Sequence, residues 1–245
     1  TVGEEITSLL SKLPQLETLF VHGFVNTKIA PFFSFGRHAT NLRSFTWESN
    51  YEQKINCQHI SSILVAEISN LISLHLNLPS ATLQNFSDLQ LMSIKELQLN
   101  CSRFEGCLTV PQNVSVTKLI LSTEESSAEE VGAVLANFTN LKTLVLDVSC
   151  NDDIRFNATL IEALVGLNSL KYFFIFDYYY SKEKYYTLND GEKSALVEAL
   201  EALKNVDIIE IEFLGGVYVD DLVTAVNNLT AKRPQQNIQL IIHGY

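Results

Sequence analysis

Residues 126–149 of the 245-residue chain read SSAEEVGAVLANFTNLKTLVLDVS, and this stretch decides the fold. Its first half predicts a helix, which Ser126 or Ser127 can cap, with apolar residues that recur at helical spacing from Val131 to Phe138. Its second half changes to a period of two, so Leu144 and Leu146 are expected to face a core. A helix, turn and strand of this size cannot bury its apolar side alone, so the unit requires a copy on either side.

Strand segments of the form L-x-x-L-x-L recur along the whole chain. Nine of them follow one another at intervals of roughly 20–30 residues, which is typical of a solenoid. They begin at Leu16, Leu42, Leu71, Ile94, Val116, Leu141, Leu170, Val206 and Asn237.

Most of the intervals between these strands carry an amphipathic pattern. Helices are predicted at 4–13, 57–68, 126–138, 157–167, 190–203 and 220–229, whereas 26–40 and 104–113 read as irregular. Equivalent strands joined through helices must run parallel, and their crossover connections are expected to be right-handed.

These L-x-x-L-x-L strands, each preceded by a helix and an x-N-L turn, resemble leucine-rich repeats of the ribonuclease-inhibitor-like class. Residues 128–150 are particularly similar to the repeats of large protist (ciliate-type) leucine-rich proteins. The resemblance implies one α/β solenoid over 1–245 with about nine degenerate units, a horseshoe with strands on its concave face and helices on its convex face. The chain departs from the family at the asparagine or cysteine that follows each strand, which is kept only at Asn50.

The charge balance limits the choice of partner. The chain has 28 acidic and 17 basic residues and a net charge of −11, which argues against binding to nucleic acid or to an anionic membrane surface. The charge suits a soluble protein or a protein partner with a basic surface. The longest apolar run, 172–176, is too short to cross a bilayer.

Cysteines and sequons point to different compartments. Cys101 and Cys107 could pair across a short loop, but we expect the four cysteines to be buried free thiols, as in a cytoplasmic protein. Six N-x-[ST] sequons, which begin at Asn85, Asn100, Asn113, Asn137, Asn157 and Asn228, instead favour a secreted or cell-surface protein.

No pattern in the sequence indicates catalysis. G-x-S-x-G and H-E-x-x-H motifs are absent, and the five histidines are widely spaced. His22 and His75 are expected on the same face but two strands apart, too far to share a metal. We therefore expect no enzymatic activity, no metal and no cofactor.

The outward-facing strand residues are the informative ones, because in such a solenoid they stack in columns across the sheet. Most are polar, but the later strands predict an apolar central column with an acidic rim, and large exposed apolar patches mark binding surfaces. The predicted partner-binding residues are Ile120, Val145, Phe174 and Ile208 in the central column, Tyr172 and Phe176 beside it, and Asp147, Glu210 and Glu212 at the rim. The tyrosine-rich insertion 178–189, or another subunit, is the alternative cover for this surface.

The sequence thus favours non-enzymatic protein–protein recognition, or a scaffold role, through the concave face. One alternative is a structural subunit or fragment of a larger assembly, because the apolar strand 238–243 lacks a polar cap. The other is the secreted or surface recognition module that the sequons suggest.

Overall fold

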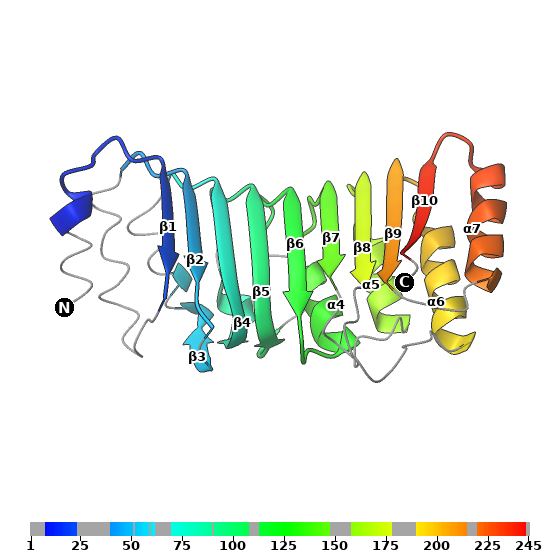
Figure 1. Ribbon diagram of the computed structural model, residues 1–245, viewed down its shortest axis with the longest axis horizontal. Helices are drawn as coiled ribbons and strands as arrows, with labels where there is room; N and C mark the ends of the chain where they lie inside the picture. Colours follow the sequence, from blue (N-terminus) through cyan, green and yellow to red (C-terminus); the bar gives the residue numbers. More distant parts are fainter. Residues whose placement is uncertain are drawn as a thin grey trace.

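A computed structural model describes residues 8–23, 40–50, 52–58, 60–61, 70–89, 91–107, 113–147, 158–177, 190–214 and 220–243. The strands of this part form a single ten-stranded sheet, and every strand pair is parallel. Nine of them lie side by side in the order of the sequence (Figure 1). They are β1 (Thr18–His22), β2 (Ser44–Glu48), β4 (Ser73–Gln84), β5 (Glu96–Phe104), β6 (Lys118–Thr123), β7 (Thr143–Asp147), β8 (Tyr172–Asp177), β9 (Ile208–Leu214) and β10 (Asn237–His243).

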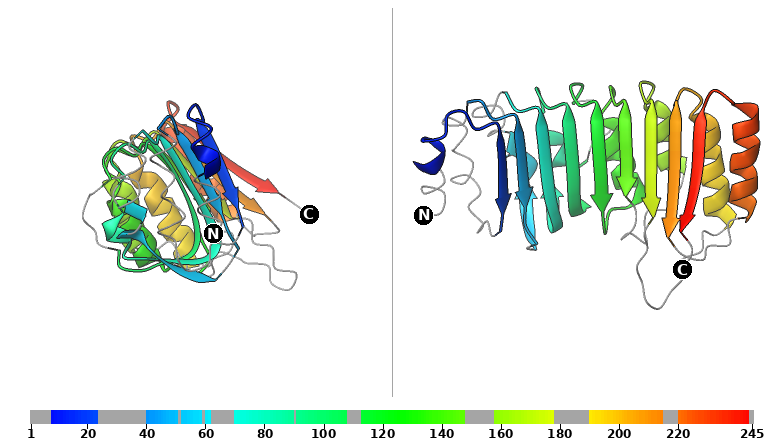
Figure 2. Two further views of the ribbon diagram at one scale, coloured as in Figure 1. Left: turned by 90° about the vertical axis from the view of Figure 1, so that its left-hand side faces the viewer. Right: turned by 45° about the horizontal axis from the view of Figure 1, so that its top comes forward.

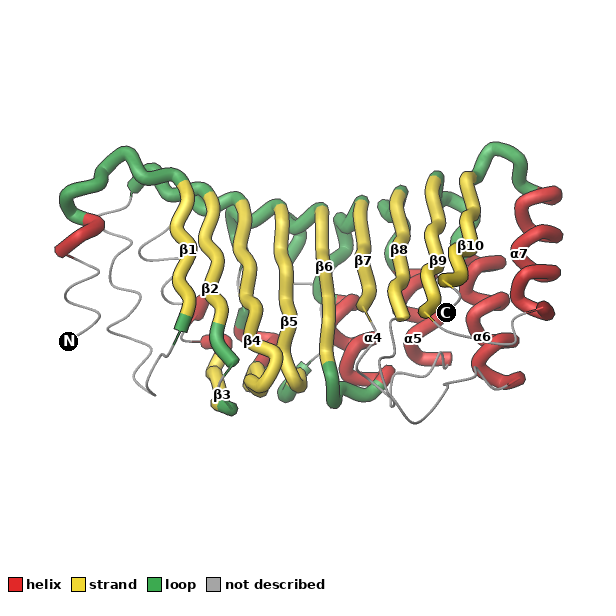
Figure 3. The backbone as a smooth tube through the Cα atoms, viewed as in Figure 1, coloured by secondary structure: helices red, strands yellow, loops and turns green. Residues whose placement is uncertain are grey.

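The helices form a second layer on one face of the sheet. They include α4 (Ala128–Ala136), α5 (Ala158–Gly166), α6 (Asp190–Ala202) and α7 (Asp220–Lys232), with a short 3-10 helix, η2 (Phe86–Asp88), between β4 and β5. The end-on view in Figure 2 separates the two layers, and Figure 3 shows the same arrangement by element type. The opposite face of the sheet has no helix over it in the described part of the chain.

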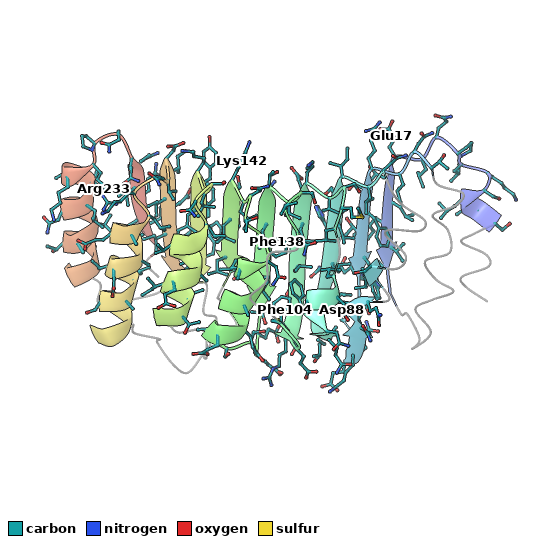
Figure 4. All side chains as sticks on the ribbon, turned by 180° about the vertical axis from the view of Figure 1, so that it is seen from behind. Glu17, Asp88, Phe104, Phe138, Lys142 and Arg233 are labelled. Atoms are coloured by element: carbon teal, nitrogen blue, oxygen red, sulfur yellow. The ribbon has the colours of Figure 1, made fainter. Side chains whose placement is uncertain are left out.

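The core lies between the two layers because each strand alternates buried and partly exposed residues. Leu144 and Leu146 of β7 are fully buried, as the sequence predicts, while Thr143, Val145 and Asp147 between them are not. Phe104 and Phe138, which are labelled in Figure 4, lie among the buried residues. The rings of both pack edge-on against Phe86, at centroid distances of 5.2 and 6.4 Å.

The stretch 126–149 folds as predicted where it is described, and it resolves which serine caps the helix. Ser127 is the N-cap of α4, and its side chain forms a capping box with Glu130. Ser126 is buried instead: its Oγ accepts a hydrogen bond from the Phe104 N–H at 3.0 Å and lies within hydrogen-bond distance, 2.8 Å, of Thr123 Oγ1. One serine therefore starts the helix while the other supports the preceding unit.

The x-N-L turns join neighbouring units through their asparagines. Asn41 donates to the Pro14 carbonyl at 2.8 Å, Asn70 to that of Thr40 at 3.0 Å and Asn140 to that of Val114 at 2.8 Å. In each case the acceptor lies in the unit before, two residues ahead of its first strand leucine or valine. These side chains supply inter-unit hydrogen bonds where the strands begin rather than where they end.

Several sequence expectations are confirmed and others need correction. The helices predicted at 157–167, 190–203 and 220–229 match α5, α6 and α7, although α7 continues to Lys232. The short strand β3 (Gln53–Asn56) is not predicted; it pairs with an extension of β4 beyond an irregularity in the β4–β5 register between Leu78 and Thr82. The start of the last unit was predicted at Asn237, but Asn237 aligns with Ile208, which is the third residue of its own unit. The last unit therefore begins two residues earlier than predicted. Predictions within 1–7, 24–39, 62–69 and 108–112 fall outside the described residues.

Candidate binding face of the sheet

The predicted partner-binding residues all lie on the helix-free face, hereafter the open face, of four adjacent strands. Strand register aligns Ile120 of β6 with Val145 of β7, and Val145 with Phe174 of β8. A second row aligns Asp147, Phe176 and Glu212. The core-facing residues between them, such as Phe173, Ile175 and Ile211, are buried. The alternation inferred from the sequence therefore brings these nine residues, the candidate patch, together.

The register corrects the composition of the central column. Tyr172 aligns with Ile208, whereas Phe174 aligns with Glu210. Ile208 therefore lies beside Tyr172, in the column formed by the first residue of each strand. Glu210, not Ile208, lies beside Phe174 in the central column. The prediction placed Ile208 in the same column as Phe174. Ile208 is the third residue of the unit that begins at Val206, whereas Phe174 is the fifth residue of the unit that begins at Leu170. An acidic residue consequently ends the run of Ile120, Val145 and Phe174.

Members of the candidate patch differ in their exposure to solvent and in the interactions that they form within the chain. Tyr172 is 40% exposed, and the remaining eight are partly buried. Asp147 accepts a 3.4 Å hydrogen bond from Ser122 Oγ, and Asp147, Phe176 and Glu212 all have further interactions within the chain. The insertion 178–189, predicted as a cover, lies outside the described residues.

The N-terminal half of the open face carries a hydrogen-bonded row that the sequence reasoning missed. His22 Nδ1 lies 3.2 Å from Glu48 Oε2, Asn77 donates to Glu48 Oε1 at 3.0 Å, and Asn100 donates to Asn77 Oδ1 at 2.8 Å. These four residues occupy the same row on β1, β2, β4 and β5. The sequence does contain a pattern that predicts this row, because each of the four residues is the seventh residue of its repeat segment. The row makes this half polar and internally satisfied.

Two further contacts lie on this half of the open face. His75 Nε2 lies 2.9 Å from Ser73 Oγ, and its partial burial lowers the pKa of the imidazole, against the opposing effect of Glu96 and together with that of Lys118. Lys118 Nζ lies 3.9 Å from Glu96 Oε1 on the neighbouring strand. His22 and His75 thus have separate partners. Within the described residues, no group of three or more His, Cys, Asp or Glu side chains is arranged to hold a metal ion.

The cysteines and sequons can be placed in part. Cys57, Cys101 and Cys107 are free thiols, so the alternative Cys101–Cys107 disulfide is not formed. Asn113 and Asn137 are buried, and a glycan on either side chain is incompatible with this fold. Asn85 and Asn228 are exposed. In the described ranges no helix has both the length and the apolar character needed to span a membrane.

Comparison with known proteins adds no assignment. No family model matches the sequence, and no curated protein matches it either. The resemblance to leucine-rich repeats accordingly rests on the strand pattern and stays a prediction. What is established is an α/β fold with one all-parallel sheet, a helical layer on one face and an open second face.

Proposed function

We propose that this chain is a solenoid of the leucine-rich-repeat type that acts as a non-enzymatic recognition module. It binds a protein partner through the open face of the sheet, which forms the concave side of a horseshoe. The sequential parallel strands, the helical layer on one face only, and the inter-unit hydrogen bonds of Asn41, Asn70 and Asn140 support the architecture.

The observation that carries the functional proposal is the apolar and aromatic surface on β6 to β8. Ile120, Val145 and Phe174 align in one column, and the 40% exposed ring of Tyr172 flanks it. Aromatic side chains of this kind provide large contact areas with little loss of conformational entropy, and they dominate binding energy at protein interfaces. On β1 to β5 the outward-facing residues of the same sheet are polar except for Phe20 at the β1 end.

Charge and cysteine chemistry indicate the partner and its compartment. Carboxylates are the only charged groups of the candidate patch and the net charge is −11, so the partner presents basic and apolar side chains and is neither nucleic acid nor an anionic membrane. Three described free thiols and two buried sequon asparagines favour a cytoplasmic protein over a secreted one. Intact-mass measurement of native material, which would reveal glycans, tests the compartment.

Affinity capture with a matched surface variant tests the binding face. Tyr172→Ser and Phe174→Ser together are expected to abolish retention of the partner from native material, because they remove the aromatic surface. Val165→Ser is the control, since Val165 is 44% exposed on α5 in the helical layer. If the double variant is folded by circular dichroism and still captures the same partner as the wild type, the proposal is wrong.

A subunit role in a larger assembly is the second candidate, and one observation favours it. At the β1 end of the sheet, Phe20 is 58% exposed, and Leu9 and Leu13 nearby are 57% and 43% exposed. Exposed apolar side chains at the end of a solenoid suit contact with a neighbouring subunit. Light scattering over a range of concentrations tests this; association that Phe20→Ser abolishes supports it, and a concentration-independent monomer mass contradicts it.

A further inference from the structure

Glu210 occupies an unusual position on the open face. It lies on β9 between Phe174 of β8 and Gln239 of β10, and it continues the column of Ile120 and Val145. The side-chain amide of Gln239 donates to Asn237 Oδ1 at 3.0 Å. The carboxylate of Glu210, which is partly buried, therefore has an aromatic ring on one neighbouring strand and an already bonded amide on the other.

The other carboxylates of the open face have partners. Glu48 contacts His22 and Asn77, and Glu96 faces Lys118. Asp147 and Glu212 have interactions within the chain. Within the described residues, Glu210 alone of these five forms no hydrogen bond or ion pair. No lysine or arginine occurs among the outward-facing residues of β7, β8 and β9 that could reach it.

A partly buried carboxylate without a partner gains most from a cation that arrives with the ligand. Desolvation of the charge is unfavourable unless an opposite charge and hydrogen-bond donors compensate it. Lysine and arginine differ here. A guanidinium group can donate two parallel hydrogen bonds to a carboxylate and stack on an aromatic face, whereas an ammonium group is a compact, strongly hydrated charge. Phe174 supplies the ring next to Glu210 that favours arginine.

We propose that the protein partner binds the open face with an arginine side chain whose guanidinium contacts Glu210 and stacks on Phe174, flanked by apolar residues that cover Val145 and Tyr172. This inference rests on the proposed function and specifies its recognition chemistry. The net charge of −11 assists the approach of such a basic segment. Charge complementarity thus acts at one residue of the apolar surface rather than only along its rim.

Selection of short random peptides displayed on phage against the immobilised protein tests both the binding face and the arginine contact with Glu210. Wild type is expected to select peptides with an arginine beside aliphatic or aromatic residues. Phe174→Ser is expected to lose the selection, and Glu210→Gln is expected to lose the preference for arginine. Glu198→Gln is the matched control, because Glu198 is exposed on α6 in the helical layer and the same charge is removed.

A double-mutant cycle on one selected peptide then isolates the contact. Replacing its arginine by citrulline, which is neutral and of similar shape, is expected to weaken binding to wild type about tenfold or more and binding to Glu210→Gln much less. Equal weakening of both proteins, with binding still dependent on Phe174, overturns the arginine contact but leaves the binding face intact. Peptides that bind the wild type and Phe174→Ser alike, or the absence of any selected peptide, contradict the proposed function itself.

Discussion

Asn113 joins the turn before β6 to the backbone at Leu91, in the unit before. Its Oδ1 accepts a hydrogen bond from the Leu91 N–H at 2.9 Å, and its Nδ2 donates to the Leu89 carbonyl at 3.0 Å. The residue is buried, with 2% of its surface exposed. One side chain therefore satisfies a buried donor and a buried acceptor in an interval that lacks a regular helix in its described part.

Asn113→Ala is expected to lower the free energy of unfolding by about 2–4 kcal/mol, because it leaves two buried backbone groups without a partner. Asn140→Ala removes one exposed hydrogen bond to Val114 and is expected to cost only about 0.5–1.5 kcal/mol. Urea unfolding of the two variants and the wild type measures the difference. Equal losses in both variants would mean that burial of Asn113 adds nothing.

The sequence predicts the scaffold well because burial alternates regularly along its strands. Leu144, Leu146 and Leu141 are fully buried, as their spacing requires. The polar residues that support the turns are less predictable, because different positions serve the same purpose. At the position where a leucine-rich repeat has an asparagine, β5 has Ser102, and its backbone carbonyl accepts a hydrogen bond from Thr123 Oγ1 at 2.7 Å. The local sequence pattern therefore predicts that the backbone groups of a turn need a hydrogen-bond partner, but it does not predict which residue supplies it.

The candidate patch is likewise predictable in part. Membership follows from alternation, but the place of each residue along its strand depends on the repeat register. The starts predicted at Leu170 and Val206 already pair Tyr172 with Ile208 and Phe174 with Glu210, as observed, so Ile208 was assigned to the wrong column although the register before β9 was predicted correctly. Interactions such as Asn100 with Asn77 depend on side-chain orientation, which spacing alone does not determine.

Ser126 and Ser127 are adjacent, yet they are expected to stabilise the fold in different ways. Ser127→Ala removes the helix cap and should cost about 1 kcal/mol. Ser126→Ala leaves the buried Phe104 N–H without its acceptor and should cost about 1–3 kcal/mol. Ser11→Ala is the control, because Ser11 is exposed and its hydroxyl donates only to the nearby Ser8 carbonyl at 2.8 Å. Urea unfolding ranks the three, and a loss for Ser127→Ala larger than for Ser126→Ala would contradict this assignment.

His75 is expected to make stability depend on pH. Its pKa in the folded protein is lowered by burial, so the folded state binds a proton less readily than the unfolded state, whose pKa is about 6.5. Its contribution is therefore present above about pH 6.5 and is lost as the pH falls below that value. NMR titration should show the lowered pKa directly. His75→Gln should reduce the slope of stability between about pH 7 and pH 5, and an unchanged slope would rule out this role.

Gly132 sets the approach of α4 to α5. A Cβ added there would lie 3.4 Å from the Thr159 carbonyl oxygen and 3.6 Å from Ala163 Cβ, which are ordinary contact distances. Gly132→Ala is expected to raise the free energy of unfolding by about 0.5–1 kcal/mol, through improved helix propensity. Gly132→Leu is expected to force the helices apart and cost about 1–3 kcal/mol. Thermal and urea unfolding of both variants should therefore shift in opposite directions; destabilisation by alanine would show that the contact is already too tight.

Cys57 and Cys101 are buried and Cys107 is partly buried, and we expect all three thiols to react slowly until the protein unfolds. Burial raises the pKa of Cys57 and of Cys101 well above the usual value, and that of Cys107 to about 12. Because the thiolate is the reactive form, alkylation at about pH 8 should be slow in the folded protein and fast in urea. Peptide mapping by mass spectrometry distinguishes the three sites from Cys150.

The same shifts have a consequence for stability at alkaline pH. Above about pH 9 the unfolded chain loses thiol protons while the folded chain keeps them, so the free energy of unfolding should fall as the pH rises. Cys57→Ala removes one titrating group from both states, and its alkaline slope should be shallower than that of the wild type. Rapid alkylation of Cys57 in the folded protein, with its circular dichroism unchanged, would contradict the burial on which this prediction depends.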